Sequence, residues 1–569
     1  MPGLTGFGEA VASANPLKEY PISSVAFTTL KKTVVPGPTP SATILLDQVS
    51  KFKQYGYGNW TLGASLKSEL RTDLMPAGYS QAAVSKKSKL LHFFTISDIH
   101  ITDKESPSQL IYLQQLVYPS KGKAPWSFVT SIYSPVMLYT THVLDAAVQT
   151  VNALHRKNPV DFGMSLGDTC NCTQYNELRW YIDVLDGKVI TPSSGAHAGA
   201  DSIDYQQPYK AAGIDKSIPW YQAIGNHDHF WIGSLPVNDE LRQSYISDTV
   251  FACGDVLIDP RNISKPDYYM GVLDGSTPYG DIKGAGPVGA FSSAPKVVAD
   301  PDRRSLTRSE WMQEFFSSTS NPRGHGFNEN DASKGFTCYS FVPKPSLPIK
   351  VIVLDDTQRE DDGSPDIHGH GFLDQARYDW LKKELAAGQA AGQLMIIAAH
   401  VPIGVEKSGS ELGWWNDAKN AVSEPDLIKE LQSHPNFMLW LAGHRHLNTV
   451  KAFPGATPEN GFWQVETSSL RDYPQQFRTF EIFLNSDNTI SMVTTNVDPA
   501  VREGSPAAKS RAYAIAAQQI VNTNVHTNNP TGDPSIRPMP TASYNGELVK
   551  KLLPEMQEKL RKLGTPVGK

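Results

Sequence analysis

The chain has little that would mark it as a disulfide-stapled, membrane-spanning or nucleic-acid-binding protein. Its four cysteines in 569 residues are too few for a disulfide framework, so we expect small, buried thiols. It contains no apolar run near the roughly 20 residues that a membrane helix requires. Acidic residues outnumber basic ones by 58 to 52, which leaves no positive excess for a phosphate backbone. We therefore expect no transmembrane segment and no dedicated nucleic-acid binding.

The amino terminus also lacks the charged start and apolar centre of a signal peptide. A chain that starts after a removed signal would look the same, so this end says nothing about export. Low charge, 19%, with abundant Asn, Thr, Tyr and Gly is a composition often met in exported bacterial proteins. We expect a periplasmic or secreted protein, with a cytoplasmic one as the alternative. The oligomeric state stays open.

From residue 90 onward, short β-rich apolar runs alternate with segments of helical periodicity. The predicted strands are 90–96, 162–166, 220–224, 349–354, 394–399 and 437–442, and the predicted helices are 136–157, 373–387 and 425–433. Strand and helix alternation predicts an α/β protein whose sheets are covered by helices. Three further strands, 462–466, 478–484 and 489–494, are predicted to form an antiparallel end.

Composition divides the chain into three parts. Residues 1–89 are rich in turns and predict an arm packed on the core, and residues 90–496 form the core domain. Long stretches near 105–135, 187–215 and 232–348 exceed simple connections and are predicted to be insertions. Residues 497–569 are predicted to be a helical extension, with helices at 507–521 and 547–562.

Acidic, imidazole and amide side chains follow the predicted strands directly. They occur as Asp98-Ile99-His100, Gly167-Asp168, Gly225-Asn226-His227-Asp228, His400 and Gly443-His444-Arg445-His446. In open α/β sheets the carboxyl ends of the strands meet at one edge, where ligands bind. These five segments should therefore deliver their side chains to a single cleft.

Hard carboxylate oxygens mixed with imidazole nitrogens suit transition-metal ions rather than a calcium cage. A site with this many ligands can hold two ions that share one carboxylate. Such a pair activates a water and stabilises an in-line displacement at phosphorus, which predicts phosphate-ester hydrolysis. Two of the motifs are commonplace alone: an Asp-x-His after a strand, or a single histidine such as His400, is more often structural. Gly-Asn-His-Asp and Gly-His-x-His at strand ends are much rarer. The interpretation depends on all five occurring in order.

Over residues 90–496 the chain resembles the calcineurin-like metallophosphoesterases, in particular a group of large exported bacterial members. The resemblance implies a four-layer α/β/β/α sandwich of two mixed sheets with long insertions and a dinuclear centre. It implies that one metal is held by Asp98, His100 and His446 and the other by Asn226, His400 and His444, with Asp168 as the bridge. It also implies that His227 is the general acid, and we expect Asp228 to orient it.

Neighbouring residues allow more than one interpretation. Asn171 could point its amide at a phosphate oxygen or cap the following helix. Arg445 could contact phosphate, although alternation along the chain would turn it away from the metals. His368-Gly369-His370 resembles a spare metal pair but is expected to be exposed or part of a lid. Trp414-Trp415 could line the leaving-group pocket or anchor its loop.

The sequence thus predicts hydrolysis of a small phosphate ester by a hydroxide that bridges two divalent or trivalent ions, with Mn, Fe or Zn expected. Phosphodiesters are favoured because only Arg445, Arg471 and Arg478 stand near the motifs to bind a monoester dianion. The alternatives are a phosphomonoesterase or nucleotidase of the same fold, and a non-catalytic metal-binding scaffold.

Overall fold

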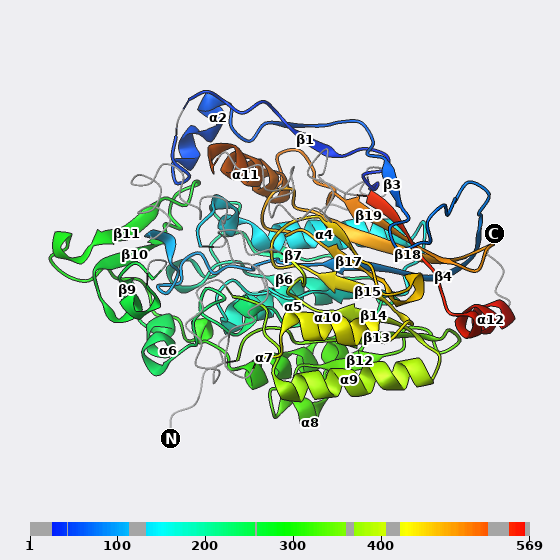
Figure 1. The fold of residues 1–569 in the computed structure, drawn as a ribbon. Coiled ribbons are helices and arrows are strands. Elements are labelled where there is room, and N and C mark those ends of the chain that lie inside the picture. Colours follow the sequence, from blue (N-terminus) through cyan, green and yellow to red (C-terminus); the bar gives the residue numbers. More distant parts are fainter. Residues whose placement is uncertain are drawn as a thin grey trace, which may run out of the picture.

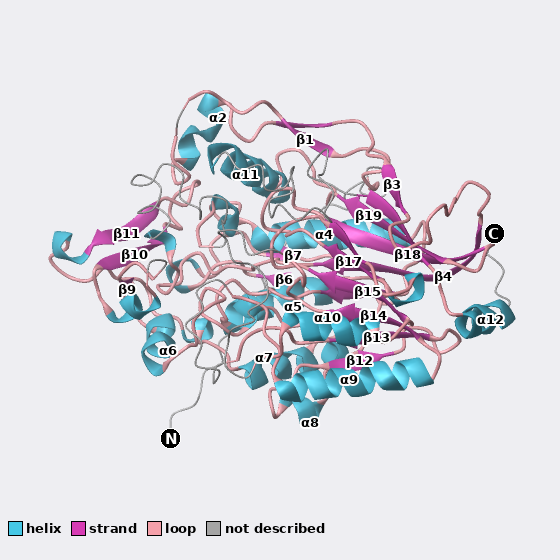
Figure 2. Cartoon of the chain, viewed as in Figure 1, coloured by secondary structure: helices cyan, strands magenta, loops and turns pink. Residues whose placement is uncertain are grey.

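The protein is a mixed α/β structure with two large mixed sheets (Figure 1 and Figure 2). The computed structural model describes residues 26–42, 44–112, 132–256, 259–359, 369–405, 421–521 and 545–563. The structure thus has the α/β class that the sequence predicts.

The first large sheet has seven strands in the order β3-β20-β19-β18-β4-β5-β8. Its strands are β3 (Ser68–Arg71), β20 (Asn545–Lys550), β19 (Ile490–Val497), β18 (Phe477–Asn485), β4 (Lys86–Ile96), β5 (Phe162–Ser165) and β8 (Trp220–Gln222). The β4, β5 and β8 strands run parallel, whereas β18 and β19 are antiparallel to their neighbours. Parallel β4, β5 and β8 bring three of the motif-bearing loops to one edge.

The second large sheet has six strands in the order β12-β13-β14-β15-β17-β16. Its strands are β12 (Tyr339–Phe341), β13 (Ile349–Val353), β14 (Leu394–Ala398), β15 (Phe437–Ala442), β17 (Phe462–Glu466) and β16 (Val450–Phe453). The four strands from β13 to β17 run parallel, and β12 and β16 flank them antiparallel. The loops after β14 and β15 carry the remaining motifs.

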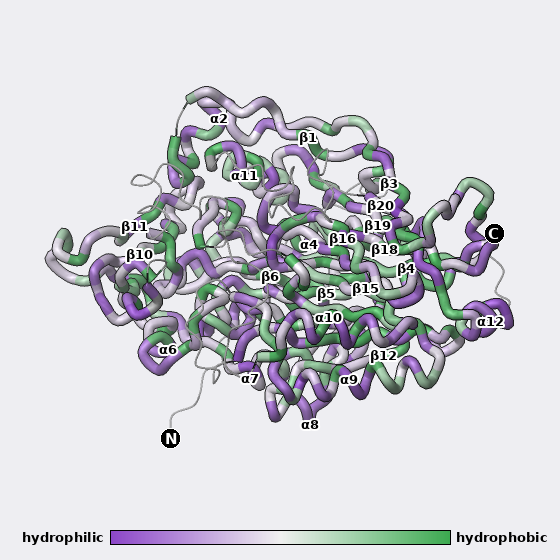
Figure 3. The backbone as a smooth tube through the Cα atoms, in the orientation of Figure 1, coloured by the Kyte–Doolittle hydropathy of each residue, from purple (hydrophilic) through white to green (hydrophobic). Residues whose placement is uncertain are grey.

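Successive side chains of the second sheet serve two apolar clusters, as the period of two in a strand requires. Residues on one face of the second sheet, such as Ile396 and Leu439, belong to a cluster that also contains Phe93 and Phe480 of the first sheet. Ile397, Trp440 and other alternate residues pack with α9 (Gln375–Ala390) and α10 (Glu424–Gln432) in a second cluster. Both faces of the second sheet are thus buried. Figure 3 shows hydrophobic residues concentrated on the central strands.

The remaining elements surround these sheets. The helices α4 (Thr140–His155) and α5 (Tyr175–Asp186) join the cluster of the first sheet. In the described part of the chain, the other α-helices are α2 (Phe52–Tyr55), α6 (Asp239–Ile246), α7 (Arg308–Glu314), α8 (Glu329–Ala332), α11 (Pro506–Val521) and α12 (Pro554–Lys562). Small sheets are formed by β1 (Val34–Pro36) with β2 (Trp60–Leu62), by β6 (Val189–Ile190) with β7 (Tyr209–Lys210), and by β9 (Ala252–Cys253), β10 (Tyr268–Leu273) and β11 (Ile282–Pro287).

Most predicted strands and helices are confirmed within a few residues, and three expectations need correction. Residues 547–550 are strand rather than helix, because β20 pairs with β19 and β3. The predicted antiparallel strand 462–466 is β17, which is antiparallel to β16 but parallel to β15, and it lies in the second sheet rather than with β18 and β19. The first core strand begins at Lys86 rather than residue 90, because its polar start is exposed and carries no apolar signal.

Among the described residues, no helix is both long and apolar enough to cross a bilayer.

Candidate metal centre

The predicted ligands come together at the carboxyl ends of strands from both large sheets. Asp98 and His100 follow β4, Asp168 follows β5 and Asn226 follows β8. His400 follows β14, while His444 and His446 follow β15. Six of the seven are buried, each less than 10% exposed, and the side chain of His446 is 13% exposed. Five loops far apart in sequence therefore meet in one cluster.

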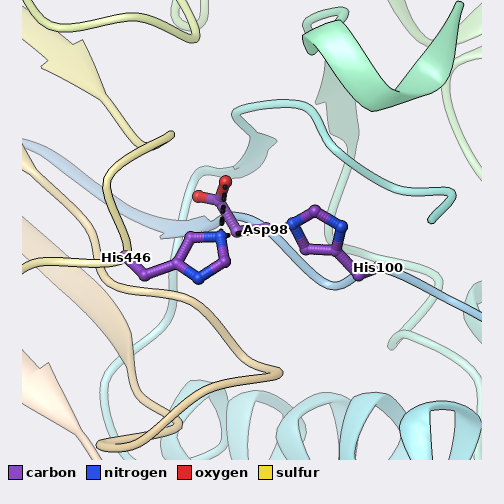
Figure 4. Close-up of side chains that lie close together, drawn as sticks. All are labelled: Asp98, His100 and His446. Carbon is purple, nitrogen blue, oxygen red and sulfur yellow. Dashed lines mark hydrogen bonds and ion pairs between the residues drawn. The ribbon is translucent and has the colours of Figure 1, made fainter. Parts of the chain in front are cut away.

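The first group consists of Asp98, His100 and His446, whose ligand atoms all lie within 4.8 Å of one another. His446 Nε2 lies 3.4 Å from Asp98 Oδ1 and 3.2 Å from His100 Nε2. Figure 4 shows the three side chains gathered from the loops after β4 and β15. This is the trio that the resemblance to the metallophosphoesterases assigns to one metal.

The second group consists of Asp168, His400 and His444, again with ligand atoms within 4.8 Å. His444 Nδ1 lies 3.3 Å from His400 Nε2 and 3.1 Å from Asn226 Oδ1. Asp168 Oδ2 lies 3.3 Å from His400 Nε2 and 3.6 Å from His100 Nε2, so it faces both groups. Asp168 thus lies between the two groups, and its role as a shared ligand stays a prediction.

The backbone at these residues is strained. The φ angles are positive at Asp98 (51°), His100 (48°), Asp168 (52°), His444 (71°) and His446 (58°). A residue with a Cβ in this region costs of order 1–3 kcal/mol and persists only where the surroundings enforce it. Strain of this kind at five of seven predicted ligands points to a site whose geometry is maintained for a purpose.

The motif glycines are required by close packing of these loops. A Cβ on Gly225 would lie 2.2 Å from both the backbone nitrogen and Oδ1 of Asp168. A Cβ on Gly443 would lie 2.5 Å from Asp98 Oδ2. Neither neighbour can move without displacing a predicted ligand, so both positions need glycine.

Asp228 holds the Asp168 loop and does not hold the His227 ring as predicted. Its carboxylate accepts hydrogen bonds from the backbone nitrogens of Asp168, Thr169, Cys170 and Gly225 and from the Thr169 hydroxyl, at 2.6–3.1 Å. The reason is the 3₁₀ turn Asn226–Asp228, which folds Asp228 back onto the preceding loop. Burial and the neighbouring Asp168 raise the pKa of Asp228 to about 7.

His227 lies beside two of the predicted ligands, His100 and Asp168. Its Nδ1 is 2.7 Å from the carbonyl oxygen of Asn171, which makes Nδ1 a donor and leaves Nε2 for the centre. A ligand atom of His227 is within 4.8 Å of those of His100 and Asp168. Burial lowers the pKa of His227. Geometry alone thus allows His227 to act beside the metals or to bind one.

The carboxylates and imidazoles of the cluster shift one another's pKa values. Burial alone would lower the pKa of His400, but Asp168 and Asp98 raise it to about 10. Burial also opposes protonation of His446, yet Asp98 and Asp472 raise its pKa to about 10. Burial disfavours ionised Asp168, but His400 and His227 hold its pKa well below the usual range. By contrast, burial and the charge of His227 hold the pKa of His100 far below its usual value.

The donor set fits metal ions. His400 Nδ1 donates to the Leu166 carbonyl oxygen at 2.8 Å, so a neutral ring presents the lone pair of Nε2 to Asp168 Oδ2. His446 repeats this pattern, with Nδ1 at 2.5 Å from Asp472 and Nε2 facing Asp98. With the pKa of both histidines raised to about 10, Nε2 carries a proton toward the carboxylate in the metal-free protein, and a metal ion would take the place of that proton. Imidazole with carboxylate and amide oxygen suits transition metals such as Mn, Fe or Zn.

The two predicted substrate-binding residues are engaged by protein groups. Asn171 donates from Nδ2 to Gln109 at 2.9 Å, and its Oδ1 accepts from Arg471. It does not cap α5, whose first residue follows Gln174. The Arg445 guanidinium binds Glu466 through two hydrogen bonds. Contact of either residue with phosphate stays a prediction.

The expectation of an exposed His368-Gly369-His370 segment is wrong for its described residues. His370 is only 9% exposed, and a Cβ on Gly369 would lie 2.4 Å from Asn226 Nδ2. This loop therefore packs against a predicted ligand. His368, Trp414 and Trp415 lie outside the described residues.

Two positions that sequence reasoning missed support the predicted ligands. Asp472 accepts from His446 Nδ1, the carboxylate–histidine arrangement that orients a metal ligand. The Gly233 carbonyl oxygen accepts from Asn226 Nδ2 at 2.9 Å, which turns Asn226 Oδ1 toward His444. Neither stands in a motif, and no spacing in the sequence could have marked them.

Comparisons with known proteins find distant likeness among solved structures. No family model matches the chain, and no curated protein matches it. A solved structure of a dimetal phosphatase from Danio rerio aligns over 73% of this chain and 98% of its own length, with 14% identity and a TM-score of 0.35. A TM-score of this size does not establish a common fold.

Proposed function

We propose that the protein is a dinuclear metal-dependent phosphoester hydrolase that favours phosphodiesters. The observation that carries the proposal is the convergence of five strand-end motifs into two adjoining groups of metal-ligand atoms with Asp168 between them. A buried constellation of this composition, on strained backbone, is typical of a hydrolytic metal centre. The resemblance of the motifs to the calcineurin-like metallophosphoesterases supports the same conclusion.

In this proposal, Asp98, His100 and His446 would hold one ion, and Asn226, His400 and His444 the other, with Asp168 shared. Such a pair would lower the pKa of a bound water and stabilise charge on the phosphate oxygens. Protonated on both ring nitrogens, His227 would transfer the Nε2 proton to the departing oxygen, since the Asn171 carbonyl oxygen holds the proton on Nδ1. A phosphorus–oxygen bond to water forms as the bond to the leaving oxygen breaks, and no covalent enzyme intermediate is needed.

The preference for diesters follows from the arginines. A monoester dianion gains from free guanidinium groups, but the three arginines near the motifs are buried against protein partners. Arg445 binds Glu466, Arg471 binds Asn171, and Arg478 donates to Thr494 and Asn448. A singly charged diester needs less of this compensation.

We further propose the four-layer α/β/β/α sandwich for residues 90–496, with 1–89 as an arm and 497–569 as an extension. The packing of α9 and α10 on one sheet and the shared apolar cluster of both sheets support the layers. The arm and the extension contribute β3 and β20 to the first sheet, so neither is expected to be dispensable.

The test is the initial rate, with defined metal content, on bis-p-nitrophenyl phosphate beside p-nitrophenyl phosphate. We expect faster cleavage of the diester and loss of both activities in Asp168→Asn, since the shared ligand is weakened. Preferential monoester cleavage would keep the metal chemistry and overturn the ester class. Asp302→Asn, an exposed acidic residue, is the matched control and should behave as wild type.

The non-catalytic scaffold makes a different prediction. A scaffold would bind both ions and leave either ester untouched. A His227→Ala variant separates the two roles of that residue: a general acid can be lost with both metals retained, whereas a ligand cannot. Metal analysis of this variant beside its rate therefore decides between them.

A further inference from the structure

A buried loop outside the motifs contacts both sides of the candidate centre. Between β17 and β18, the Ser469 hydroxyl donates to the Asp98 carbonyl oxygen at 2.6 Å, and Asp472 accepts from His446. Arg471 of the same loop donates to the side chain of Asn171. Three neighbouring positions of one loop thus contact Asp98, His446 and the residue that binds His227.

Arg471 is unusual because it is fully buried, 0% exposed, with its charge inside the protein. Burial lowers its pKa to about 10, with Asp472 and Glu177 opposing that shift. Burying a guanidinium is expensive unless its partners repay the desolvation. Since it is screened from solvent, it cannot reach a substrate phosphate without a rearrangement. Its hydrogen bond to Asn171 indicates where it acts.

Asn171 is clamped from several directions. Its backbone nitrogen is 2.9 Å from the Ile101 carbonyl oxygen and 3.1 Å from Glu177 Oε2, and the next backbone nitrogen is 2.8 Å from the same carboxylate oxygen. Its side chain is held by Gln109 at Nδ2 and by Arg471 at Oδ1. What this clamp presents is the carbonyl oxygen that accepts from His227 Nδ1.

We propose that Arg471 is a positioning residue for His227. By holding the Asn171 side chain, it keeps the Asn171 carbonyl oxygen on Nδ1 and so fixes the direction of Nε2 toward the centre. Glu177 supports the same carbonyl from the backbone side. The consequence for the reaction rests on the proposed function, because only there does His227 protonate a leaving oxygen.

The kinetic test compares two diesters of similar shape and different leaving groups, diphenyl phosphate and bis-p-nitrophenyl phosphate. A p-nitrophenolate departs with little help, whereas phenolate needs the proton more. We expect Arg471→Met to lower kcat for diphenyl phosphate by about tenfold or more, and for bis-p-nitrophenyl phosphate by less than about threefold. Asn171→Ala removes the same contact from the other side and should give the same pattern, with no further loss in the double variant.

The matched control is Arg71→Met, which removes another arginine only 1% exposed from β3, where it pairs with Asp73. Its ratio of the two rates should equal that of wild type. Equal losses on both diesters in Arg471→Met with both metals retained would overturn the proposal. A loss of metal would also overturn it, because Arg471 would then support the metal ligands rather than His227.

A second measurement does not need activity. Long-range ¹H–¹⁵N spectra of the imidazole rings report which nitrogen carries the proton, and His227→Asn identifies the signal. In wild type we expect Nδ1 of His227 to keep its proton while Nε2 alone titrates. In Arg471→Met we expect the neutral ring to be a mixture of Nδ1–H and Nε2–H tautomers. An unchanged signal would overturn the positioning role, whether or not the esters are cleaved. If wild type with both metals cleaves neither diester, the proposed function fails by itself.

Discussion

Asp228→Asn tests whether the Asp168 loop depends on a single carboxylate. Asp228 Oδ2 accepts from the backbone nitrogens of Asp168 and Gly225, and Oδ1 accepts from those of Thr169 and Cys170 and from the Thr169 hydroxyl. Asparagine is the same size, but its amide nitrogen must face one of these sets. At least two buried backbone N–H groups then lose their acceptor.

Each orphaned buried donor costs about 1–3 kcal/mol, so the variant should lose about 2–6 kcal/mol of unfolding free energy. Urea unfolding of the metal-free protein measures this, with the slope unchanged if the folded state stays compact. Metal content should fall as well, since the loop carries Asp168. Unfolding at the same urea concentration as wild type would refute the reasoning, because the five contacts would then contribute nothing.

Three further predictions concern other positions. Asp472→Asn should weaken one metal by about 10–100-fold, because His446 loses the carboxylate on Nδ1; calorimetric titration with Mn²⁺ or Zn²⁺ checks it, and two unchanged affinities would count against it. Gly233→Ala should lower the diester rate by at least about tenfold, since its Cβ would lie 2.3 Å from Asn226 Nδ2 and 2.6 Å from His227 Nε2; a wild-type rate would contradict this. Asp145→Asn should change the pH dependence of unfolding, because burial raises the pKa of Asp145 from 3.8 to about 6. The folded state binds this proton more tightly than the unfolded state does. The resulting stabilisation is present at low pH and is lost as pH rises from about 4 to 6. Relative to the variant, wild type should lose roughly 3 kcal/mol over that window, and parallel stability curves would exclude it.

The convergence of the candidate ligands could be predicted from sequence because the position of each depends on local information. A continuous apolar run predicts a buried strand, and it locates the end of that strand within a few positions. Asp98, Asp168 and His400 are of this kind. The parallel arrangement of the strands then brings their ends together, whatever the insertions between them contain.

The supporting residues could not be predicted because their contacts depend on tertiary packing. Arg471 and Asn171 are 300 positions apart, and Asp472 lies in a loop with no apolar or motif signal. The role of Asp228 was misassigned because adjacency in sequence suggested contact with His227, whereas the 3₁₀ turn directs it elsewhere. The helical prediction for 547–550 failed because pairing with β19 and β3 outweighs local periodicity.

The most direct test of the central claim follows metal occupancy and hydrolysis together. Metal-free protein is titrated with Mn²⁺ while bound metal and the rate on bis-p-nitrophenyl phosphate are measured at each step, in wild type and in Asp168→Asn. We predict that wild type binds two ions per chain and that hydrolysis rises with the second, while the variant binds fewer and stays inactive. A wild-type chain that binds two ions and cleaves neither ester, or an Asp168→Asn variant as active as wild type, would contradict a dinuclear hydrolytic centre.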